Sequence, residues 1–84
     1  MNEDTEYQLK NEIALGDRAE KAYSLYLKSY IENLYKKYYD EFIATNDLDV
    51  AYSIKLQQNA VKDLEQGILT AIETGKLARV QLNE

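Results

Sequence analysis

The sequence predicts an all-α protein built around a long antiparallel helical hairpin. Three observations support this prediction. The 84-residue chain has no proline and only three glycines, no alternation of apolar and polar residues extends beyond a few positions, and Leu, Ala, Glu, Lys and Gln outnumber the β-branched residues. These residue types favour helices, whereas proline and glycine interrupt them. We therefore expect one helical domain with two long helices and a short N-terminal helix.

The first fifteen residues (1–15) are expected to form that short N-terminal helix, or an arm. Thr5 and Gln8 have the spacing of a capping box, in which a hydroxyl caps the first turn and the glutamine reaches back. Gly16 and Asp17 form a candidate break, because glycine often ends a helix and aspartate often caps the next one. The same glycine can also lie within one continuous helix, so both possibilities remain open.

The first long helix is predicted over 17–45. Its apolar residues recur at steps of three and four, the spacing that places side chains on one face of a helix. This apolar stripe consists of Tyr23, Leu27, Tyr30, Ile31, Leu34, Tyr38 and Phe42. Asn46 and Asp47 then give the strongest turn signal in the chain, since either residue can cap the helix that follows.

The second long helix, predicted over 47–82, has a regular heptad pattern. Steps of four and three alternate without interruption through Val50, Ile54, Gln57, Val61, Leu64, Ile68, Ala71, Gly75, Ala78 and Leu82. Such a seam is typical of a helix that packs at a shallow angle along another helix. Gln57 is the register candidate: it either fixes register or oligomeric state, or lies at a solvated edge. Gly75 either ends the helix or lets a neighbour approach closely.

Two helices alone leave an apolar face open. A chain of this size has little core to offset the conformational entropy lost on folding. We therefore expect one of two arrangements, which can also coexist. Either the N-terminal helix folds back to complete a three-helix bundle, or hairpins associate into a homo-oligomer.

The composition excludes most catalytic chemistry. The chain has no cysteine and no histidine, which excludes histidine-dependent triads, thiol chemistry and the commonest metal ligands. No glycine-rich phosphate loop is present, and Asp47 with Asp49 lacks the rest of a calcium-binding loop. We therefore expect no catalytic residues, no metal, no cofactor and no enzyme activity.

Charge and hydropathy narrow the choice of partners. The net charge of −5 opposes nonspecific binding to phosphates, so nucleic acid is not an expected partner. No apolar run is long enough to cross a membrane. The first residues are acidic, whereas secretory and transit peptides are basic, so we expect a protein that is not secreted.

The eight tyrosines are the unusual feature of the composition. Six of them lie in the first long helix, and they cannot all face one core. Tyrosine combines a large apolar ring with a polar hydroxyl, which explains its enrichment at protein interfaces. Two interpretations remain open: packing in and around the core, or a tyrosine-lined protein-binding face. The candidate interface tyrosines are Tyr26, Tyr35, Tyr39 and Tyr52.

Four short motifs stand out between residues 16 and 82. They are Gly16-Asp17-Arg18-Ala19-Glu20, Tyr30-Ile31-Glu32, Asp47 with Asp49, and Glu73-Thr74-Gly75-Lys76-Leu77-Ala78. Together they resemble a group of short helical proteins that tailed bacteriophages encode near head-assembly and packaging genes. The tyrosine-rich first helix departs from that group. The resemblance transfers no catalytic residue, and it implies that Gly75, Lys76 and Leu77 form a contact element.

Three functions follow as hypotheses, each with a location in the host cytoplasm, in the virion or in both. The favoured one is a non-enzymatic phage protein, associated with the virion or with head assembly, that contacts capsid, portal or connector subunits. The alternative is a small acidic inhibitor of a host defence or nucleic-acid-handling protein. The third is a small packaging (terminase) subunit, which must touch DNA and which the acidic charge disfavours.

Overall fold

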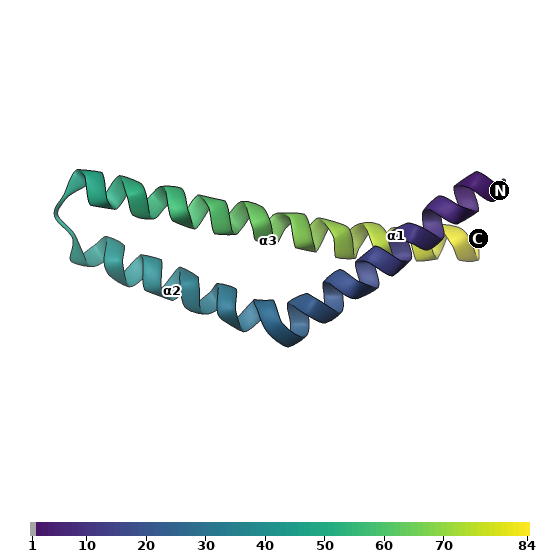
Figure 1. Cartoon of the computed structure of the whole chain (residues 1–84), viewed down its shortest axis with the longest axis horizontal. Helices are drawn as coiled ribbons and strands as arrows, with labels where there is room; N and C mark the ends of the chain where they lie inside the picture. Colours follow the sequence, from purple (N-terminus) through teal and green to yellow (C-terminus); the bar gives the residue numbers. More distant parts are fainter. Residues whose placement is uncertain (1) are drawn as a thin grey trace.

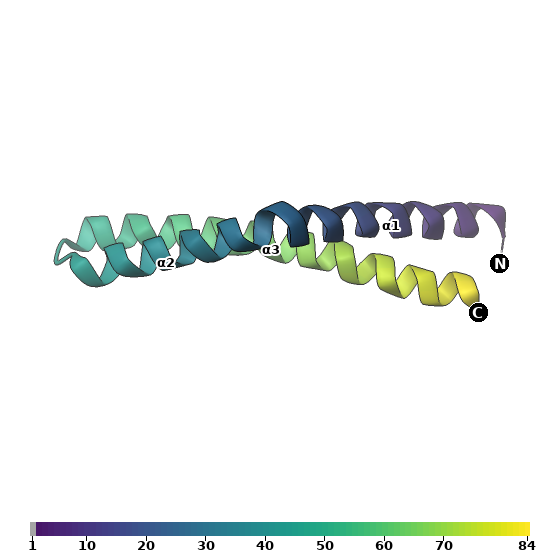
Figure 2. The same ribbon diagram turned by 90° about the horizontal axis from the view of Figure 1, so that it is seen from below.

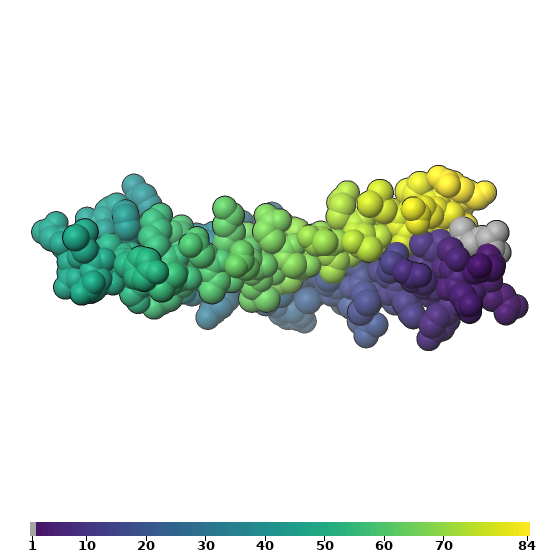
Figure 3. Space-filling view, turned by 90° about the horizontal axis from the view of Figure 1, so that it is seen from above, coloured from purple at the N-terminus to yellow at the C-terminus, as the bar shows by residue number. Residues whose placement is uncertain are grey.

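The computed structural model describes residues 2–84, which form two long helical arms packed antiparallel as an extended hairpin (Figure 1). The first arm, of 42 residues, consists of α1 (Glu3–Ala22), a π-helical segment η1 (Tyr23–Leu27) and α2 (Lys28–Ala44). The second arm is α3 (Leu48–Asn83). The molecule is a thin rod of 59 × 22 × 14 Å (Figure 3). The predicted all-α class and the antiparallel hairpin are therefore confirmed.

The prediction of a separate N-terminal helix is wrong. Helix α1 runs without a break through Gly16 and Asp17, so residues 2–84 contain no separate short helix that could complete a three-helix bundle. The helix also begins before the expected capping box. Asn2 is its N-cap and accepts a 2.8 Å hydrogen bond from the Thr5 amide. Asparagine is among the best N-cap residues, and three acidic side chains in the first turn favour the same start.

The first arm bends at η1, which the sequence analysis did not predict. In this segment the hydrogen bonds span five residues, as between the Lys28 amide and the Tyr23 carbonyl. A turn of this kind is wider than an α-helical turn and is a known cause of helix kinks. Because of the bend, α2 runs beside α3, whereas α1 crosses α3 at an angle (Figures 1 and 2).

Helices α1 and α3 meet most closely at Gly16 and Gly75, a contact that we call the glycine crossing. Both residues are buried. A Cβ added to Gly75 would lie 2.9 Å from the Gly16 Cα and 3.0 Å from the Glu12 carbonyl oxygen. The two backbones therefore touch directly, and this close approach requires glycine. It also explains why neither glycine ends a helix.

The buried core is small and lies mainly around the glycine crossing. The buried apolar residues are Leu9, Ile31, Ile54, Ile72 and Ala78. Residues 28–62, which we call the hairpin half, contribute only Ile31 and Ile54 to this set. Residues 2–27 and 63–84, the terminal half, contribute the rest. An ion pair between Arg79 and Asp17 (2.9 Å) also joins α1 to α3 in the terminal half, although both side chains are exposed.

The turn between the arms follows the sequence prediction closely. Asp47 is the N-cap of α3, and its carboxylate accepts hydrogen bonds from the Asp49 amide (2.9 Å) and the Val50 amide (3.2 Å). The Thr45 hydroxyl accepts a further bond, of 3.1 Å, from the Asp47 amide. The helix ends on either side of this turn lie within one residue of the predicted limits.

The heptad seam of α3 is covered along only part of its length. Its members from Ile68 to Leu82 are buried or half-buried, as are Ile54 and Val61, whereas Val50, Gln57 and Leu64 are exposed. Their neighbours Ala51, Gln58 and Glu65 are half-buried instead. In the hairpin half, α2 therefore packs against one flank of the predicted seam and leaves the other flank open.

Candidate protein-binding surfaces

The hairpin half presents two surfaces, one on each side of the contact between α2 and α3. Helical spacing separates them on α2, because residues three, four or seven positions apart share a face. The first surface, the aromatic face, consists of Tyr35, Tyr39, Phe42, Ile43 and Tyr52. The second, the hairpin groove, is lined by Glu41, Ala44, Thr45, Val50, Ser53, Ile54 and Gln57.

The aromatic face is a stripe of rings along α2, extended by one tyrosine of α3. Tyr39, Ile43 and Tyr52 are 62 %, 62 % and 67 % exposed. The Lys55 ammonium lies 4.8 Å from the centre of the Phe42 ring, which places this flank of α3 beside the stripe. Tyr52 precedes Lys55 by one helical turn. The result is an exposed aromatic surface with a cation held over one of its rings, a geometry that is favourable for both groups.

Glu65 anchors one end of the aromatic face. Its carboxylate accepts hydrogen bonds from the hydroxyls of Tyr23 (3.0 Å) and Tyr35 (3.1 Å). The bond to Glu65 and burial raise the pKa of Tyr23, while burial and the same carboxylate raise the pKa of Tyr35. Because Tyr23 lies in η1 and Tyr35 in α2, this one side chain ties both the bend and α2 to α3. Tyr35 is consequently fixed in position at the edge of the face.

A polar depression of about 440 Å³ borders the aromatic face next to Glu65. It is lined by Tyr35, Lys55, Gln58, Asn59, Lys62, Glu65 and Gln66. Since both oxygens of Glu65 accept tyrosine hydroxyls, the two lysines give this border its cationic character. An aromatic surface bordered by lysines matches a partner surface that combines apolar and acidic side chains.

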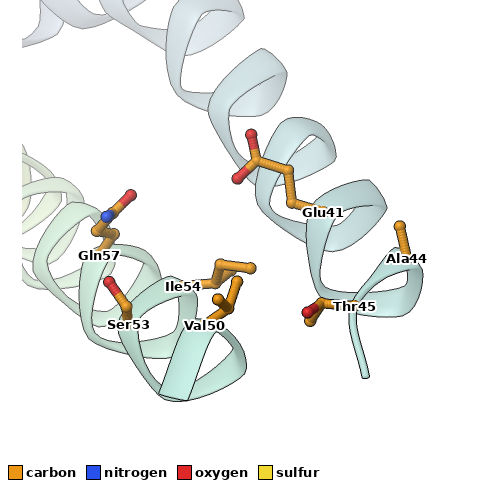
Figure 4. Close-up of a pocket in the computed structure, with 7 residues that line it drawn as sticks. All are labelled: Glu41, Ala44, Thr45, Val50, Ser53, Ile54 and Gln57. Atoms are coloured by element: carbon orange, nitrogen blue, oxygen red, sulfur yellow. The ribbon is translucent and has the colours of Figure 1, made fainter. Parts of the chain in front are cut away.

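The hairpin groove lies on the opposite flank and has a volume of about 510 Å³. Val50 and Ile54 project from α3 toward α2, and Thr45 faces them from the end of α2, with Ala44 beside it on the outer side of the helix (Figure 4). Glu41, Ser53 and Gln57 add polar groups farther from the turn. Gln57, the predicted register residue, is exposed in this groove.

No protein-family model, curated protein or solved structure matches this chain. The resemblance to phage proteins therefore depends on its short motifs alone. Within residues 2–84, no three acidic side chains gather closely enough to hold a metal ion. No helix in the same range is both long and apolar enough to cross a membrane.

The structure brings three of the predicted interface residues, Tyr35, Tyr39 and Tyr52, to the aromatic face. Tyr26, Lys76 and Leu77 are exposed elsewhere on the rod. Gly75 is buried against Gly16, so as part of the predicted contact element it contacts this chain's own α1. The two outer motifs of the phage resemblance therefore meet at the glycine crossing.

Sequence reasoning missed Phe42, Ile43 and Glu65 as parts of the site. The sequence analysis places Phe42 in the apolar stripe of the first long helix, yet the side chain is 38 % exposed. The spacing of positions 35, 39, 42 and 43 could have identified the stripe as a second face, because these positions share one side of a helix. The role of Glu65 had no such signal, since it depends on contacts 30 and 42 residues away along the chain.

Proposed function

We propose that this chain is a non-enzymatic binding protein that contacts another protein through its aromatic face. One observation carries the proposal: three exposed rings, those of Tyr39, Phe42 and Tyr52, lie with the exposed Ile43 on one flank of a hairpin that buries five apolar side chains within residues 2–84. Contiguous exposed aromatic surface is typical of protein-binding sites. The tyrosine ring is large and has few rotatable bonds, so burying it against a partner costs little conformational entropy.

We further propose a structural subunit of a tailed phage, in the capsid, portal or connector, as the partner. The support is the motif resemblance over residues 16–82. Three of the four resembling motifs coincide with the glycine crossing and the turn, which set the architecture of the hairpin. The tyrosine-rich stretch, where the sequence departs from the phage group, supplies the aromatic face. In this proposal the hairpin architecture is shared with the phage proteins, and the aromatic face selects the partner of this chain.

Site-specific photo-crosslinking tests the proposal. A photoreactive phenylalanine analogue replaces Tyr39 or Tyr52 in infected cells, with the exposed Tyr7 of the terminal half as the matched control. We expect crosslinks to one capsid, portal or connector subunit from positions 39 and 52 and not from position 7. Equal crosslinking from position 7 would contradict a role for the aromatic face. Absence of any phage structural protein among the products would refute the proposed partner.

One observation favours a second candidate function, an acidic inhibitor of a host protein. The hairpin half has five lysines and five acidic residues, so the net charge of −5 lies entirely on residues 1–27 and 63–84. The terminal half would then bind a basic site, with an affinity that falls steeply as salt rises. Affinity capture from host extract at low and high salt tests this candidate. Failure to capture a basic host protein at low salt would exclude it.

A further inference from the structure

The open flank of the α3 seam is a stripe that no other segment within residues 2–84 covers. Val50 is 45 % exposed and Leu64 is 63 % exposed, with Gln57 midway between them. On α2 the matching stripe contains Tyr30, Leu34, Lys37, Glu41 and Ala44, at alternating steps of four and three residues. Glu41 and Ala44 line the hairpin groove, which shows that this stripe is its opposite wall.

The two stripes are level with one another along the rod. Ala44 and Val50 each lie three residues from Asp47, and Tyr30 and Leu64 each lie seventeen residues from it. In an antiparallel hairpin, residues equally distant from the turn lie side by side. The hairpin groove is therefore one end of a longer open face that extends to Tyr30 and Leu64.

This open face is self-complementary under a two-fold rotation. An antiparallel copy related by an axis at Gln57 brings Val50 of each chain against Leu64 of the other. The same axis brings the large Tyr30 against the small Ala44. Gln57 meets its own counterpart, and two side-chain amides can exchange a pair of hydrogen bonds because each has a donor and an acceptor. Such isologous contacts are the usual basis of homodimers.

Charge also favours a second copy over another protein. The charged residues of the open face are Lys37 and Glu41, which form an ion pair of 3.9 Å, and the hairpin half has no net charge. The axis at Gln57 also places Lys37 level with its own counterpart, and the Glu41 carboxylate paired with each Lys37 offsets the repulsion between the two ammonium groups. Two hairpin halves without net charge therefore meet, although the whole chain carries −5. The terminal halves, which hold that charge, would point to opposite ends of an antiparallel dimer.

From this geometry we infer that a second copy of the chain covers the open face, in an antiparallel two-fold dimer with its axis at Gln57. The dimer is a four-helix bundle over the hairpin halves, with α3 packed on α3 and α2 on α2. It buries Val50 and Leu64 and thereby uses the flank of the heptad seam that α2 leaves free. The aromatic face lies on the opposite flank and stays accessible, so this inference is independent of the proposed function.

The molar mass of the purified full-length chain, measured by light scattering during dilution, is the first test. We expect twice the mass of the chain at high concentration. The variants V50K and L64E should each raise the dimer dissociation constant by roughly a hundredfold, because each buries an unpaired charge twice. Both side chains are exposed in the single chain, so helix content by circular dichroism should not change. L77E, at an exposed site in the terminal half, is the matched control and should dimerise normally.

Mixing the two variants tests the antiparallel arrangement itself. In a V50K and L64E heterodimer the introduced charges face each other at one contact, and Val50 faces Leu64 at the other. We therefore expect the mixture to form dimers that neither variant forms alone. A parallel dimer would give no such rescue and would overturn the proposed axis.

The absence of cysteine from the chain allows a second, independent test. Q57C should form an interchain disulfide rapidly under mild oxidation, whereas K76C, on the exposed surface of the terminal half, should not. A mass equal to one chain at every concentration, together with equal oxidation rates for Q57C and K76C, would overturn the inference. A larger oligomer that V50K and L64E leave intact would overturn it as well.

Discussion

Replacing Gly75 by alanine should destabilise the hairpin, although alanine is the better helix former. The added Cβ would lie 2.9 Å from the Gly16 Cα and 3.0 Å from the Glu12 carbonyl oxygen. Both neighbours are backbone atoms, so no flexible side chain can move aside. Overpacking of this kind costs about 1–3 kcal/mol. The higher helix propensity of alanine returns about 1 kcal/mol.

Gly67→Ala is the matched control, because it makes the same chemical change in the same helix. A Cβ at Gly67 meets no atom within 4 Å. This variant should gain about 0.5–1 kcal/mol of stability from helix propensity alone. Since the propensity contribution cancels between the two variants, the difference between them isolates the packing cost. We expect Gly67→Ala to be more stable than Gly75→Ala by about 1–3 kcal/mol.

Thermal and urea unfolding, followed by circular dichroism, measure this difference. For a domain of this size, 1 kcal/mol corresponds to about 4–8 °C in Tm. The variants must be compared at one protein concentration, because association shifts apparent stability. Gly16→Ala should behave like Gly75→Ala, since its Cβ meets the Gly75 Cα at the same 2.9 Å. If Gly75→Ala and Gly67→Ala stabilise the chain equally, the glycine crossing does not exist as described.

The remaining predictions concern the Glu65 cluster and the small core. Glu65→Gln removes the carboxylate that raises the pKa of Tyr23 and Tyr35, so ultraviolet titration should show both tyrosines ionising closer to the ordinary pKa of 10. Because a raised pKa means that the folded state holds its protons more tightly, the two tyrosines should contribute their full stabilisation below pH 10 and lose it as pH rises through the raised values. Urea unfolding at several pH values should show a weaker fall for Glu65→Gln, and an identical fall would contradict the hydrogen bonds. The variant Ile31→Ala, at a site only 3 % exposed, should lower the free energy of unfolding by about 2–5 kcal/mol. The variant Leu48→Ala, at a site 86 % exposed, should change the same quantity by less than about 0.5 kcal/mol.

The hairpin itself could be predicted from the sequence because its signals are local. The turn at Asp47 depends on one side chain that caps the helix it precedes. The length of α3 follows from an apolar period that needs no knowledge of the partner helix. Both features depend on residues close together in the chain, which is where sequence patterns are most informative.

The features that the sequence analysis missed depend on residues far apart in the chain. From the sequence alone, Gly16 is a plausible helix end. Its actual role is to make room for Gly75, which lies 59 residues later in the chain, and no local pattern indicates that contact. The π-helical segment left only a weak signal, two successive apolar steps of four from Tyr23 to Leu27 to Ile31. Because of the bend at that segment, α2 packs on one flank of the α3 seam. The unbroken heptad pattern of α3 does not indicate that its partner covers only one flank. The aromatic face was foreseen only in part for the same reason.

The glycine crossing packs α1 tightly against α3, whereas we propose that the hairpin half is completed by association with a second copy of the chain. Residue-resolved amide hydrogen exchange, measured on the purified chain at low and high concentration, tests this claim most directly. We predict slow exchange around Gly16 and Gly75 at both concentrations. We predict fast exchange between residues 28 and 62 in dilute protein, and slow exchange there at high concentration. Exchange in the hairpin half that is independent of concentration, or as slow in dilute protein as at the glycine crossing, would contradict the account.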